Sequence, residues 1–426
     1  MAKRLEQHLN AHHLHDNLQS AYRSCHSTET ALLRVHHDIT MALDNKCMAV
    51  LVLLDLSAAF DVIDHGILYE RLEHSYGICN DALNWIQSYL SNRTQCVAVG
   101  SCTSTDKHLN FGVPQGSVLG PRKYCLYSKP IGEICRRHNL LYHCYADDTQ
   151  VYMVIRPSDS WDNLATKMEA CLADISLWMS SNMLKLNQDK TELIVFSSKH
   201  QAKKTQDFHL TVGGSVVNAV HSVRNLGVYL DSSLTMDKQV NAVSRACFYQ
   251  IRNIGCIRQF LTTDACKTLV NSLVTSRLDY GNALLYGIPK LLTARLQRVQ
   301  NSAARLITRT RKREHITPVL KSLHWLPVVY IPQYKLLMYT YKALNSTAPV
   351  YLEELVIPYH PRRSMRSESG CLLCVPKTRT ATYGNRCFSK SAASLWNNLP
   401  MKTRQSKSLN LFKKNVKTHF FDMAYS

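Results

Sequence analysis

Three aspartates in the N-terminal part of the chain stand where their carboxylates could bind a metal ion. Asp55 directly follows seven consecutive apolar residues, Met48–Leu54, which predict a buried strand. An ionised carboxylate at the end of such a strand costs several kcal/mol unless it is paired or bound to a cation. Asp147 and Asp148 are adjacent, so their charges repel each other, and a divalent cation relieves that repulsion.

Each aspartate also has a simpler explanation when it is taken alone: Asp55 as a cap or turn residue, and Asp147 and Asp148 as an acidic hairpin turn. Together, three carboxylates on two apolar strands form the donor set of a two-metal site. In such a site, two Mg²⁺ ions about 3.5–4 Å apart activate a 3′-hydroxyl and stabilise a leaving pyrophosphate. Hard oxygen ligands favour Mg²⁺ or Mn²⁺ over zinc. The acids alone do not distinguish a polymerase from a two-metal nuclease.

The pattern of apolar residues predicts the elements that position these acids. Strands over 140–145 and 149–155 form a hairpin whose turn holds Asp147 and Asp148. A helix is predicted over 31–43, with Ser27 and Thr28 as candidate caps. Helices and strands interleave up to about residue 235, and helical patterns dominate beyond it. The sequence therefore predicts an α+β domain followed by a mostly helical region. Further predicted elements are a β-like stretch over 95–99, a helix over 163–178, a strand over 192–196 and an amphipathic stretch over 409–420.

The net charge of the chain is concentrated in its last third. The whole chain carries 51 Lys and Arg against 31 Asp and Glu, a net charge of +20. Residues 290–426 hold 24 of the basic and 5 of the acidic residues, net +19, whereas residues 1–289 carry a net +1. Such a surplus is typical of proteins that bind nucleic acid or an anionic membrane surface. The N-terminus has no apolar signal region, and no apolar run is long enough to span a bilayer, so the membrane reading is not favoured and an intracellular protein is expected.

A basic helix is predicted over 291–309, with one apolar face and a neighbouring stripe of arginines. We expect this stripe and the basic string after it to contact phosphates of a nucleic acid, although a solvated amphipathic face has the same pattern. The basic string is also typical of nuclear localisation signals. The predicted nucleic-acid contacts are Arg295, Arg298, Arg305, Arg309, Arg311, Lys312 and Arg313.

The 15 cysteines show no disulfide framework, and we expect them to be reduced thiols. Cys371 and Cys374 have C-x-x-C spacing. A zinc site needs four ligands, and only Cys387 and distant histidines are available to complete one. A metal site at this pair is therefore not the favoured interpretation.

An ordered series of motifs resembles the reverse transcriptases of LINE-type (non-long-terminal-repeat) retrotransposons, in particular those of jockey- and chicken-repeat-type elements. The motifs that carry the resemblance are QSAYRSCHSTETALLRV at 19–35, LVLLDLSAAFDVIDH at 51–65, GVPQGSVLGP at 112–121, HCYADDTQVY at 143–152, LKLNQDKTELIVF at 184–196 and VRNLGVYLD at 223–231. The resemblance implies a right-hand polymerase with a palm and partial fingers over 1–235, a helical thumb-like region over 236–345 and a basic C-terminal region over 346–426.

The resemblance also implies roles for residues of the metal and nucleotide sites. Asp55, Asp147 and Asp148 would hold Mg²⁺ or Mn²⁺, assisted by the carbonyl of Leu56, and Lys190 would be a proton donor to pyrophosphate. The nucleotide pocket would be lined by Phe60, Gln115 and Gly116. The primer would be positioned by Leu226 and Gly227. Phe60 would exclude a ribose 2′-hydroxyl, which implies a preference for deoxynucleotides. Core packing for Phe60, an ordinary Pro-Gln-Gly turn for Gln115 and a surface lysine for Lys190 are the plainer explanations.

Three departures from the family pattern carry expectations of their own. Arg122 and Lys123 stand where the family has an apolar run, and these charges are expected to disturb the helix there. The fingers strand that grips the triphosphate and the N-terminal endonuclease are not in this sequence, so we expect an element whose 5′ end is missing and whose endonuclease comes from elsewhere. The predicted activity is copying of an RNA template from a DNA primer with dNTP, in the nucleus and cytoplasmic ribonucleoprotein. The alternative is an inactive or domesticated fragment that only binds nucleic acid.

Overall fold

The computed structural model describes residues 1–57, 60–198, 201, 208–360 and 371–426. Its contacts divide the chain into two compact units. The first unit comprises Met1–His26, Val50–Val195 and Lys204–Val220, and the second comprises Ser27–Ala49, Phe196–Lys203 and His221–Ser426. The three-part division proposed from the sequence stays a prediction.

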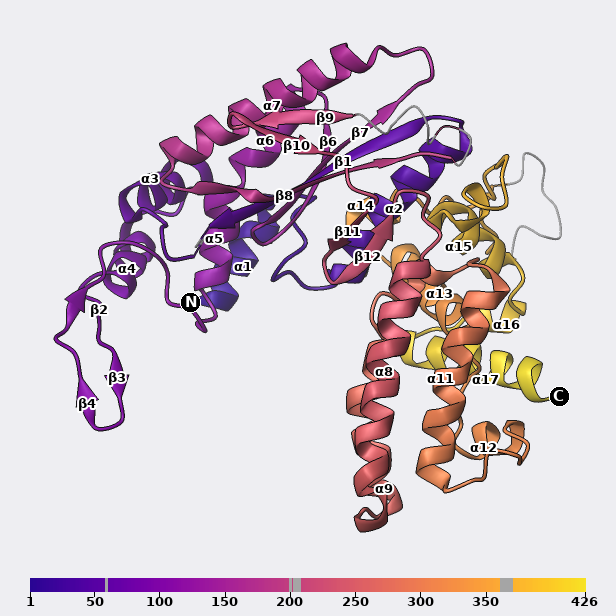
Figure 1. Cartoon of the computed structure of the whole chain (residues 1–426). Helices are drawn as coiled ribbons and strands as arrows, with labels where there is room; N and C mark the ends of the chain where they lie inside the picture. The colour runs from indigo at the N-terminus through magenta and orange to yellow at the C-terminus, as the bar shows by residue number, and fades with distance from the viewer. Residues whose placement is uncertain (58–59, 199–200, 202–207, 361–370) are drawn as a thin grey trace. The chain divides into compact units, whose positions relative to one another are not determined.

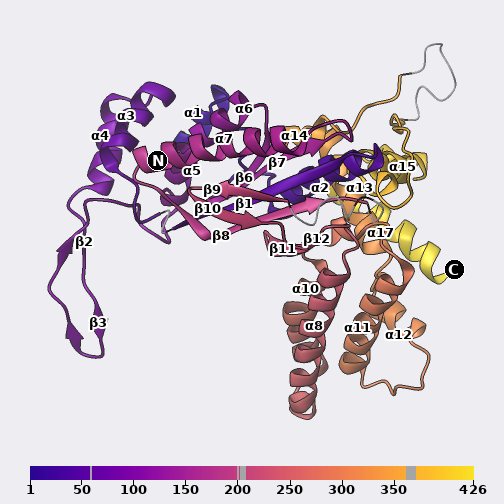
Figure 2. The same cartoon turned by 45° about the horizontal axis from the view of Figure 1, so that its top comes forward.

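The first unit is built on a four-stranded sheet with the strand order β6-β7-β1-β8 (Figures 1 and 2). The strands are β1 (Met48–Ser57), β6 (Leu141–Tyr145), β7 (Asp148–Ile155) and β8 (Lys185–Phe196). Strand β1 lies inside the sheet and is buried at almost every position, which explains its unbroken apolar run. The predicted strand over 48–54 and the predicted hairpin are therefore confirmed. Strand β8 starts earlier than expected because its first half is polar and partly exposed at the sheet edge.

Helices pack around this sheet, and α7 (Trp161–Ser181) runs along it in Figure 2. The predicted helix over 163–178 is thus confirmed and slightly longer. The other helices of the unit are α1 (Ala2–Ala11), α3 (His65–Tyr76), α4 (Asn80–Leu90), α5 (Gly120–Ser128) and α6 (Pro130–Arg137). Strands β9 (His209–Val212) and β10 (Ser215–Asn218) form an antiparallel pair.

The β-like stretch over 95–99 belongs to a long exposed hairpin arm (Figure 1). Two short ladders hold the arm together: β2 (Thr94–Gln95) pairs with β5 (Lys107–His108), and β3 (Ala98–Val99) pairs with β4 (Cys102–Thr103). Every residue of these four strands is exposed. The arm therefore contributes no core to the first unit.

Helix α5 forms despite Arg122 and Lys123, so the expected disturbance is wrong. Arg122 lies at the surface of the helix, where its guanidinium is 3.6 Å from a carboxylate oxygen of Glu6. Lys123 is fully buried, and its ammonium lies 3.8 Å from the ring centroid of Tyr89. Burial lowers the pKa of Lys123 to about 7, so the neutral amine is readily populated near neutral pH and the helix accommodates the side chain.

The second unit is mostly helical. Helix α2 (Thr28–Asp44) is capped by Ser27, one of the two candidate caps, and Ser27 also forms a capping box with Thr30. The predicted helices over 291–309 and 409–420 are found as α11 (Lys290–Thr308) and α17 (Leu409–Tyr425). Helix α11 packs along α8 (Asp237–Ile257), as Figures 1 and 2 show. The remaining α-helices are α9 (Thr263–Val270), α10 (Ser276–Asp279), α12 (Thr317–Ser322), α13 (Tyr330–Leu344), α14 (Val350–Glu353), α15 (Phe388–Asn397) and α16 (Met401–Arg404).

One two-stranded antiparallel sheet belongs to this unit, formed by β11 (Ser222–Asn225) and β12 (Val228–Asp231). None of the described helices of either unit is both long and apolar enough to cross a membrane.

Candidate active site

The hairpin of β6 and β7 brings the adjacent aspartates next to the strand that carries the third. Tyr145 pairs with Asp148, so Ala146 and Asp147 form a two-residue turn and Asp148 is the first residue of β7. Strand β7 neighbours β1, which holds Asp55 near its C-terminal end. The three predicted metal ligands therefore come from two adjacent strands and the turn between β6 and β7.

The charges of these aspartates affect one another. The pKa of Asp148 is raised to about 6, first by partial desolvation, then by the charges of Asp147 and Asp55. The pKa of Asp147 is also raised, by desolvation and by Asp55. Since the side chain of Asp148 is exposed at the surface, solvent screens part of this effect. The direction of the shifts still shows that the three carboxylates lie within electrostatic range of each other.

Lys190 is paired with Asp55. It lies on β8, the other neighbour of β1, and its Nζ is 3.3 Å from Asp55 Oδ2. The lysine side chain is 68% exposed and the aspartate side chain 32% exposed. Asp55 Oδ2 has no hydrogen-bond partner, so the contact with Lys190 is electrostatic. The sequence-predicted proton donor thus lies beside the predicted metal ligands.

The donor set fits a hard divalent cation. Among the residues that the structure describes, no three His, Cys, Asp or Glu side chains form a ready-made metal cluster. The three aspartates nevertheless offer only carboxylate oxygens, the ligands that Mg²⁺ and Mn²⁺ prefer. Desolvation is the main cause of the raised pKa values of Asp147 and Asp148, and a divalent cation would offset the repulsion that adds to it.

The predicted nucleotide-binding residues lie in two segments that are hydrogen-bonded to each other. Val113 N donates to Phe60 O at 2.9 Å, and Gly112 N donates to Ile63 O at 2.8 Å. These bonds tie the loop that holds Gln115 and Gly116 to the segment after β1. A Cβ on Gly112 would lie 2.7 Å from the carbonyl oxygen of Asp61, so glycine is required for this close approach.

Within these segments the side chains have protein partners. Gln115 Nε2 donates to Asp61 Oδ1 at 2.7 Å, and the ring of Phe60 lies 4.9 Å from that of Tyr124 between centroids. Gly116 has φ +77°, and a Cβ there would meet nothing within 4 Å, so its conformation and not lack of space favours glycine. Leu56 is buried in β1. The structure thus groups Leu56, Phe60, Gln115 and Gly116 around the C-terminal end of β1.

The predicted primer-positioning residues belong to the second unit. Leu226 and Gly227 are the two-residue turn between β11 and β12, since Asn225 pairs with Val228.

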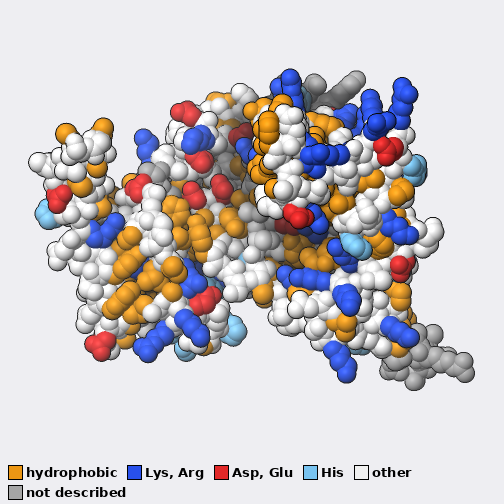
Figure 3. All heavy atoms as spheres, turned by 90° about the horizontal axis from the view of Figure 1, so that it is seen from below, with side chains coloured by type: hydrophobic (Ala, Val, Ile, Leu, Met, Phe, Trp, Pro, Cys, Tyr) orange, Lys and Arg blue, Asp and Glu red, His pale blue; other side chains and the backbone are white. Residues whose placement is uncertain are grey.

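The predicted basic face of α11 is only partly free for a ligand. Its apolar side is buried, as expected, at Leu292, Leu296, Val299 and Ala303. Three of the four arginines of the predicted stripe bind protein groups: Arg295 is 3.6 Å from Asp237 Oδ1, Arg305 donates to Glu314 O at 2.7 Å, and Arg309 donates to Arg258 O at 3.4 Å. The exposed basic side chains are Arg298, Arg309, Arg311, Lys312 and Arg313. Figure 3 shows several Lys and Arg side chains on the surface of the helical part of this unit.

Cys371 and Cys374 are exposed and form no disulfide with any described cysteine, whereas Cys387 is buried.

Comparison with known proteins identifies the family. The model of the family described as "Reverse transcriptase (RNA-dependent DNA polymerase)" matches residues 1–230, more than half of the chain. The chain belongs to the reverse transcriptase family. The predicted α+β fold class with the right-hand polymerase architecture is therefore confirmed.

Curated relatives of this reverse transcriptase are proteins of mobile elements. It is 26% identical over 321 residues to the probable RNA-directed DNA polymerase from transposon BS of Drosophila melanogaster, a match that covers 72% of this chain and 34% of that protein. It is 26% identical over 284 residues to the RNA-directed DNA polymerase from mobile element jockey of the same fly, which covers 63% of this chain and 29% of that protein. The chain thus spans about a third of the length of these relatives, and the predicted resemblance to LINE-type elements is confirmed.

Two of the solved structures that the chain matches are telomerases. The structure of apo telomerase from Candida tropicalis is 12% identical, with a TM-score of 0.43, over 78% of this chain and 54% of that chain. A telomerase from Candida albicans, solved with a fragment of telomeric RNA, is 13% identical, with a TM-score of 0.36, over 72% of this chain and 53% of that chain.

One residue of the candidate site was missed by the sequence reasoning. Gln19 is buried, and its segment pairs with β6: Ser20 N donates to Cys144 O at 2.9 Å and Cys144 N donates to Leu18 O at 2.8 Å. The amide of Gln19 then reaches the turn itself. Gln19 Nε2 donates to Ala146 O at 3.1 Å, and Ala146 N donates to Gln19 Oε1 at 2.9 Å.

This amide satisfies both main-chain groups of a turn residue in an unusual conformation. Ala146 has φ +57°, which is uncommon for a residue with a Cβ. It directly precedes Asp147 and Asp148. The sequence offered one signal, a polar residue in the quoted motif at 19–35, but no local pattern links it to a turn 127 residues away.

Proposed function

We propose that the chain is the RNA-directed DNA polymerase of a LINE-type retrotransposon, which transfers a nucleotidyl group from dNTP to a primer 3′-hydroxyl. The observation that carries this proposal is the meeting of three carboxylates on β1 and the β6–β7 turn, in a chain of the reverse transcriptase family. A plain turn does not explain why three acids that repel one another lie close together, whereas the binding of divalent cations does.

Asp55, Asp147 and Asp148 would hold Mg²⁺, with Mn²⁺ as the alternative ion, and the carbonyl of Leu56 would assist. The bound ions would supply stabilisation of the charge that develops on the attacking and leaving oxygens. Lys190 lies beside these acids, with its Nζ 3.3 Å from Asp55 Oδ2. From that position it would give a proton to the departing pyrophosphate.

The substrates proposed for the site are dNTP, an RNA template and a DNA primer. Phe60 would lie under the sugar and exclude a ribose 2′-hydroxyl, and Gln115 and Gly116 would line the pocket. Leu226 and Gly227 would position the primer end. The exposed basic side chains on and after α11 would bind phosphates, and their affinity would fall with rising salt. We further propose that the protein works in a nuclear or cytoplasmic ribonucleoprotein.

Extension of oligo(dT) on poly(rA) with Mg²⁺ and dTTP tests the proposal. The polymerase is supported if the wild type extends the primer and Asp147→Asn does not. The matched control, Asp106→Asn in the exposed hairpin arm, should extend the primer like the wild type. Salt-sensitive RNA binding without extension would instead support a fragment that only binds nucleic acid. Cleavage of a labelled nucleic acid without extension would point to a two-metal nuclease.

A further inference from the structure

The turn between β11 and β12 has a backbone that needs outside support. Leu226 and Gly227 have φ +41° and +81°, so both central residues of this two-residue hairpin turn are left-handed. Asparagine and glycine are the residues that adopt this turn readily, and a leucine at positive φ is strained. The strands on either side are four residues each, and a two-stranded hairpin of that size is marginally stable alone.

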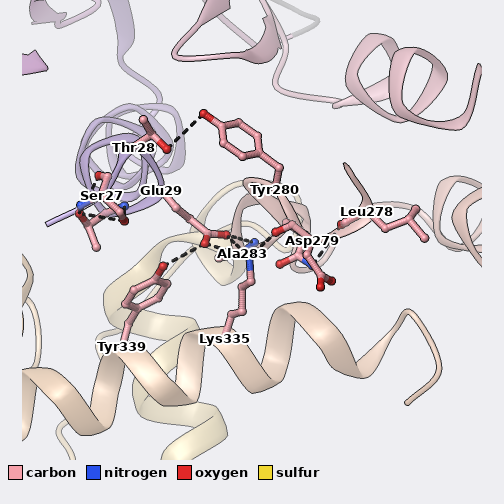
Figure 4. A network of polar contacts seen from close by, with 11 residues as sticks. Ser27, Thr28, Glu29, Leu278, Asp279, Tyr280, Ala283, Lys335 and Tyr339 are labelled. Carbon is pink, nitrogen blue, oxygen red and sulfur yellow. Dashed lines mark hydrogen bonds and ion pairs between the residues drawn. The ribbon is translucent and has the colours of Figure 1, made fainter. Parts of the chain in front are cut away.

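Tyr280 contacts both residues of the turn. Its hydroxyl donates to Leu226 O at 2.7 Å. The same hydroxyl lies 3.1 Å from Thr28 Oγ1, a contact that Figure 4 marks with a dashed line. Its ring lies directly over Gly227, because a Cβ placed on that glycine would be 3.1 Å from Tyr280 Cε1. One side chain thus bonds the strained carbonyl and fills the space beside the glycine.

A partly buried ion pair between Glu29 and Lys335 fixes the segment that carries Tyr280. Glu29 is buried, its carboxylate lies 3.0 Å from Lys335 Nζ, and it accepts a hydrogen bond from the hydroxyl of Tyr339 at 2.9 Å. The same carboxylate accepts the main-chain N–H of Ala283 at 2.9 Å. Lys335 in turn donates to the carbonyl of Asp279, the residue before Tyr280 (Figure 4).

The main chain on both sides of Tyr280 is therefore held to one carboxylate. Asp279 is tied through Lys335 and Ala283 is tied directly, so the phenol projects from a braced segment. Removing Lys335 would leave the buried Glu29 carboxylate without its cation, which is costly and therefore favours the braced arrangement. The Tyr280 side chain itself is 44% exposed and lies at the surface, where the turn would meet a ligand.

We propose that Tyr280 is a positioning residue for the primer 3′ end, which it sets by holding the Leu226–Gly227 turn in its strained conformation. The inference rests on the proposed function, since it takes this turn to be the one that positions the primer. Tyr280 acts through the turn and touches no reacting atom. A turn released from Tyr280 samples other conformations, and fewer bound primers are then aligned for attack.

Single-turnover extension by a Tyr280→Phe variant tests this role. The change removes only the hydroxyl, and the matched control is Tyr359→Phe at another exposed tyrosine of the same unit. We expect the rate constant at saturating dTTP to fall two- to tenfold, the range for one lost hydrogen bond. The concentration of dTTP that gives half the maximal rate should stay within twofold. The midpoint of thermal unfolding should also stay near that of the control.

Hydrogen exchange supplies a readout independent of activity. The amides of Asn225 and Val228 should exchange faster in Tyr280→Phe than in the wild type and the control. An unchanged rate constant with unchanged exchange, in a wild-type chain that extends the primer, overturns the inference and leaves the proposed function standing. A lower rate constant that is accompanied by a lower midpoint of thermal unfolding overturns the inference in favour of a general structural role. A wild-type chain that extends no primer overturns the proposed function and this inference with it.

Discussion

The side-chain amide of Gln19 is hydrogen-bonded twice to the main chain of Ala146, one donor and one acceptor on each side. A glutamine amide has the same donor and acceptor geometry as a peptide group. Gln19 thus supplies the pairing that a neighbouring strand would give, at the one turn residue that precedes both Asp147 and Asp148. The position of these two acids depends on a side chain outside their own hairpin.

Replacing Gln19 should therefore lower stability and extension activity, although Gln19 is far from Asp147 and Asp148 in the sequence. Gln19→Leu leaves a buried N–H and a buried C=O of Ala146 without partners, which costs about 1–3 kcal/mol of unfolding free energy for each group. Gln19→Glu keeps the acceptor and sets a carboxylate against the carbonyl. We expect both variants to lose stability in urea and extension activity, whereas Gln7→Leu at an exposed position changes neither. Wild-type extension by Gln19→Leu would contradict the positioning role.

The repulsion among the acids predicts that the ionised Asp148 carboxylate lowers the stability of the fold while being required for extension. Its pKa of about 6 in the folded chain lies above the ordinary value of 3.8, so the folded state binds the proton more tightly. Without divalent cations, stability should then fall as the pH rises through 6. Asp148→Asn should raise the midpoint of thermal unfolding at pH 8 while abolishing extension.

Added Mg²⁺ gives the complementary measurement on the same variants. It should raise the unfolding midpoint of the wild type at pH 8 and leave Asp148→Asn unchanged, because the ion binds only the intact acid set. Asp106→Asn should behave like the wild type. If Mg²⁺ shifted the midpoints of wild type and Asp148→Asn equally, the assignment of the metal to these acids would be wrong.

The buried amine of Lys123 predicts a stabilising substitution. Its pKa of about 7 lies below the ordinary 10.5, so the unfolded chain binds more protons between these values. The free energy of unfolding should rise with pH in that window, by at most about 1.4 kcal/mol per pH unit from this group. Lys123→Met should raise the unfolding midpoint at pH 7 and flatten this dependence. Lys107→Met in the exposed arm is the control, and a lower midpoint for Lys123→Met would count against a buried, uncompensated amine.

The ion pair between Lys190 and Asp55 predicts opposite effects on metal affinity and on rate. The ammonium 3.3 Å from Asp55 Oδ2 competes with a cation for that oxygen. Lys190→Met should therefore lower the Mg²⁺ concentration that gives half-maximal extension about two- to fivefold, since an exposed pair contributes up to about 1 kcal/mol. The maximal rate should fall because a proton donor is lost. A rise in the Mg²⁺ requirement would show that the lysine does not compete with the metal.

Elements with strong local patterns could be predicted from the sequence. The apolar run of β1, the capped helix α2 and the apolar face of α11 follow from short-range periodicity, and the structure has all three. The candidate metal ligands followed from residue type and from the family resemblance. Their approach across β1 and β7 required the order of the strands, which no local pattern encodes.

The missed features depend on contacts between distant segments. Neither the Gln19–Ala146 pair nor the Tyr280–Leu226 bond has a local signature. Charge counts predicted an arginine stripe on α11, but only the structure shows that Arg305 and Arg295 bind protein groups. Helix α5 was expected to be disturbed because sequence reasoning treats lysine as always charged, and burial changes its protonation.

The strand order of the sheet has a consequence for how the chain folds during its synthesis. Strand β1 ends at Ser57, while its neighbours β7 and β8 begin at Asp148 and Lys185. An emerging chain therefore carries the apolar segment Met48–Leu54 through the synthesis of nearly a hundred further residues before its first sheet neighbour exists. Such long-range pairing is slow and leaves an aggregation-prone strand exposed in the meantime. Chaperone binding during translation should concentrate on this segment, and the acid of β1 becomes part of a site only late in folding.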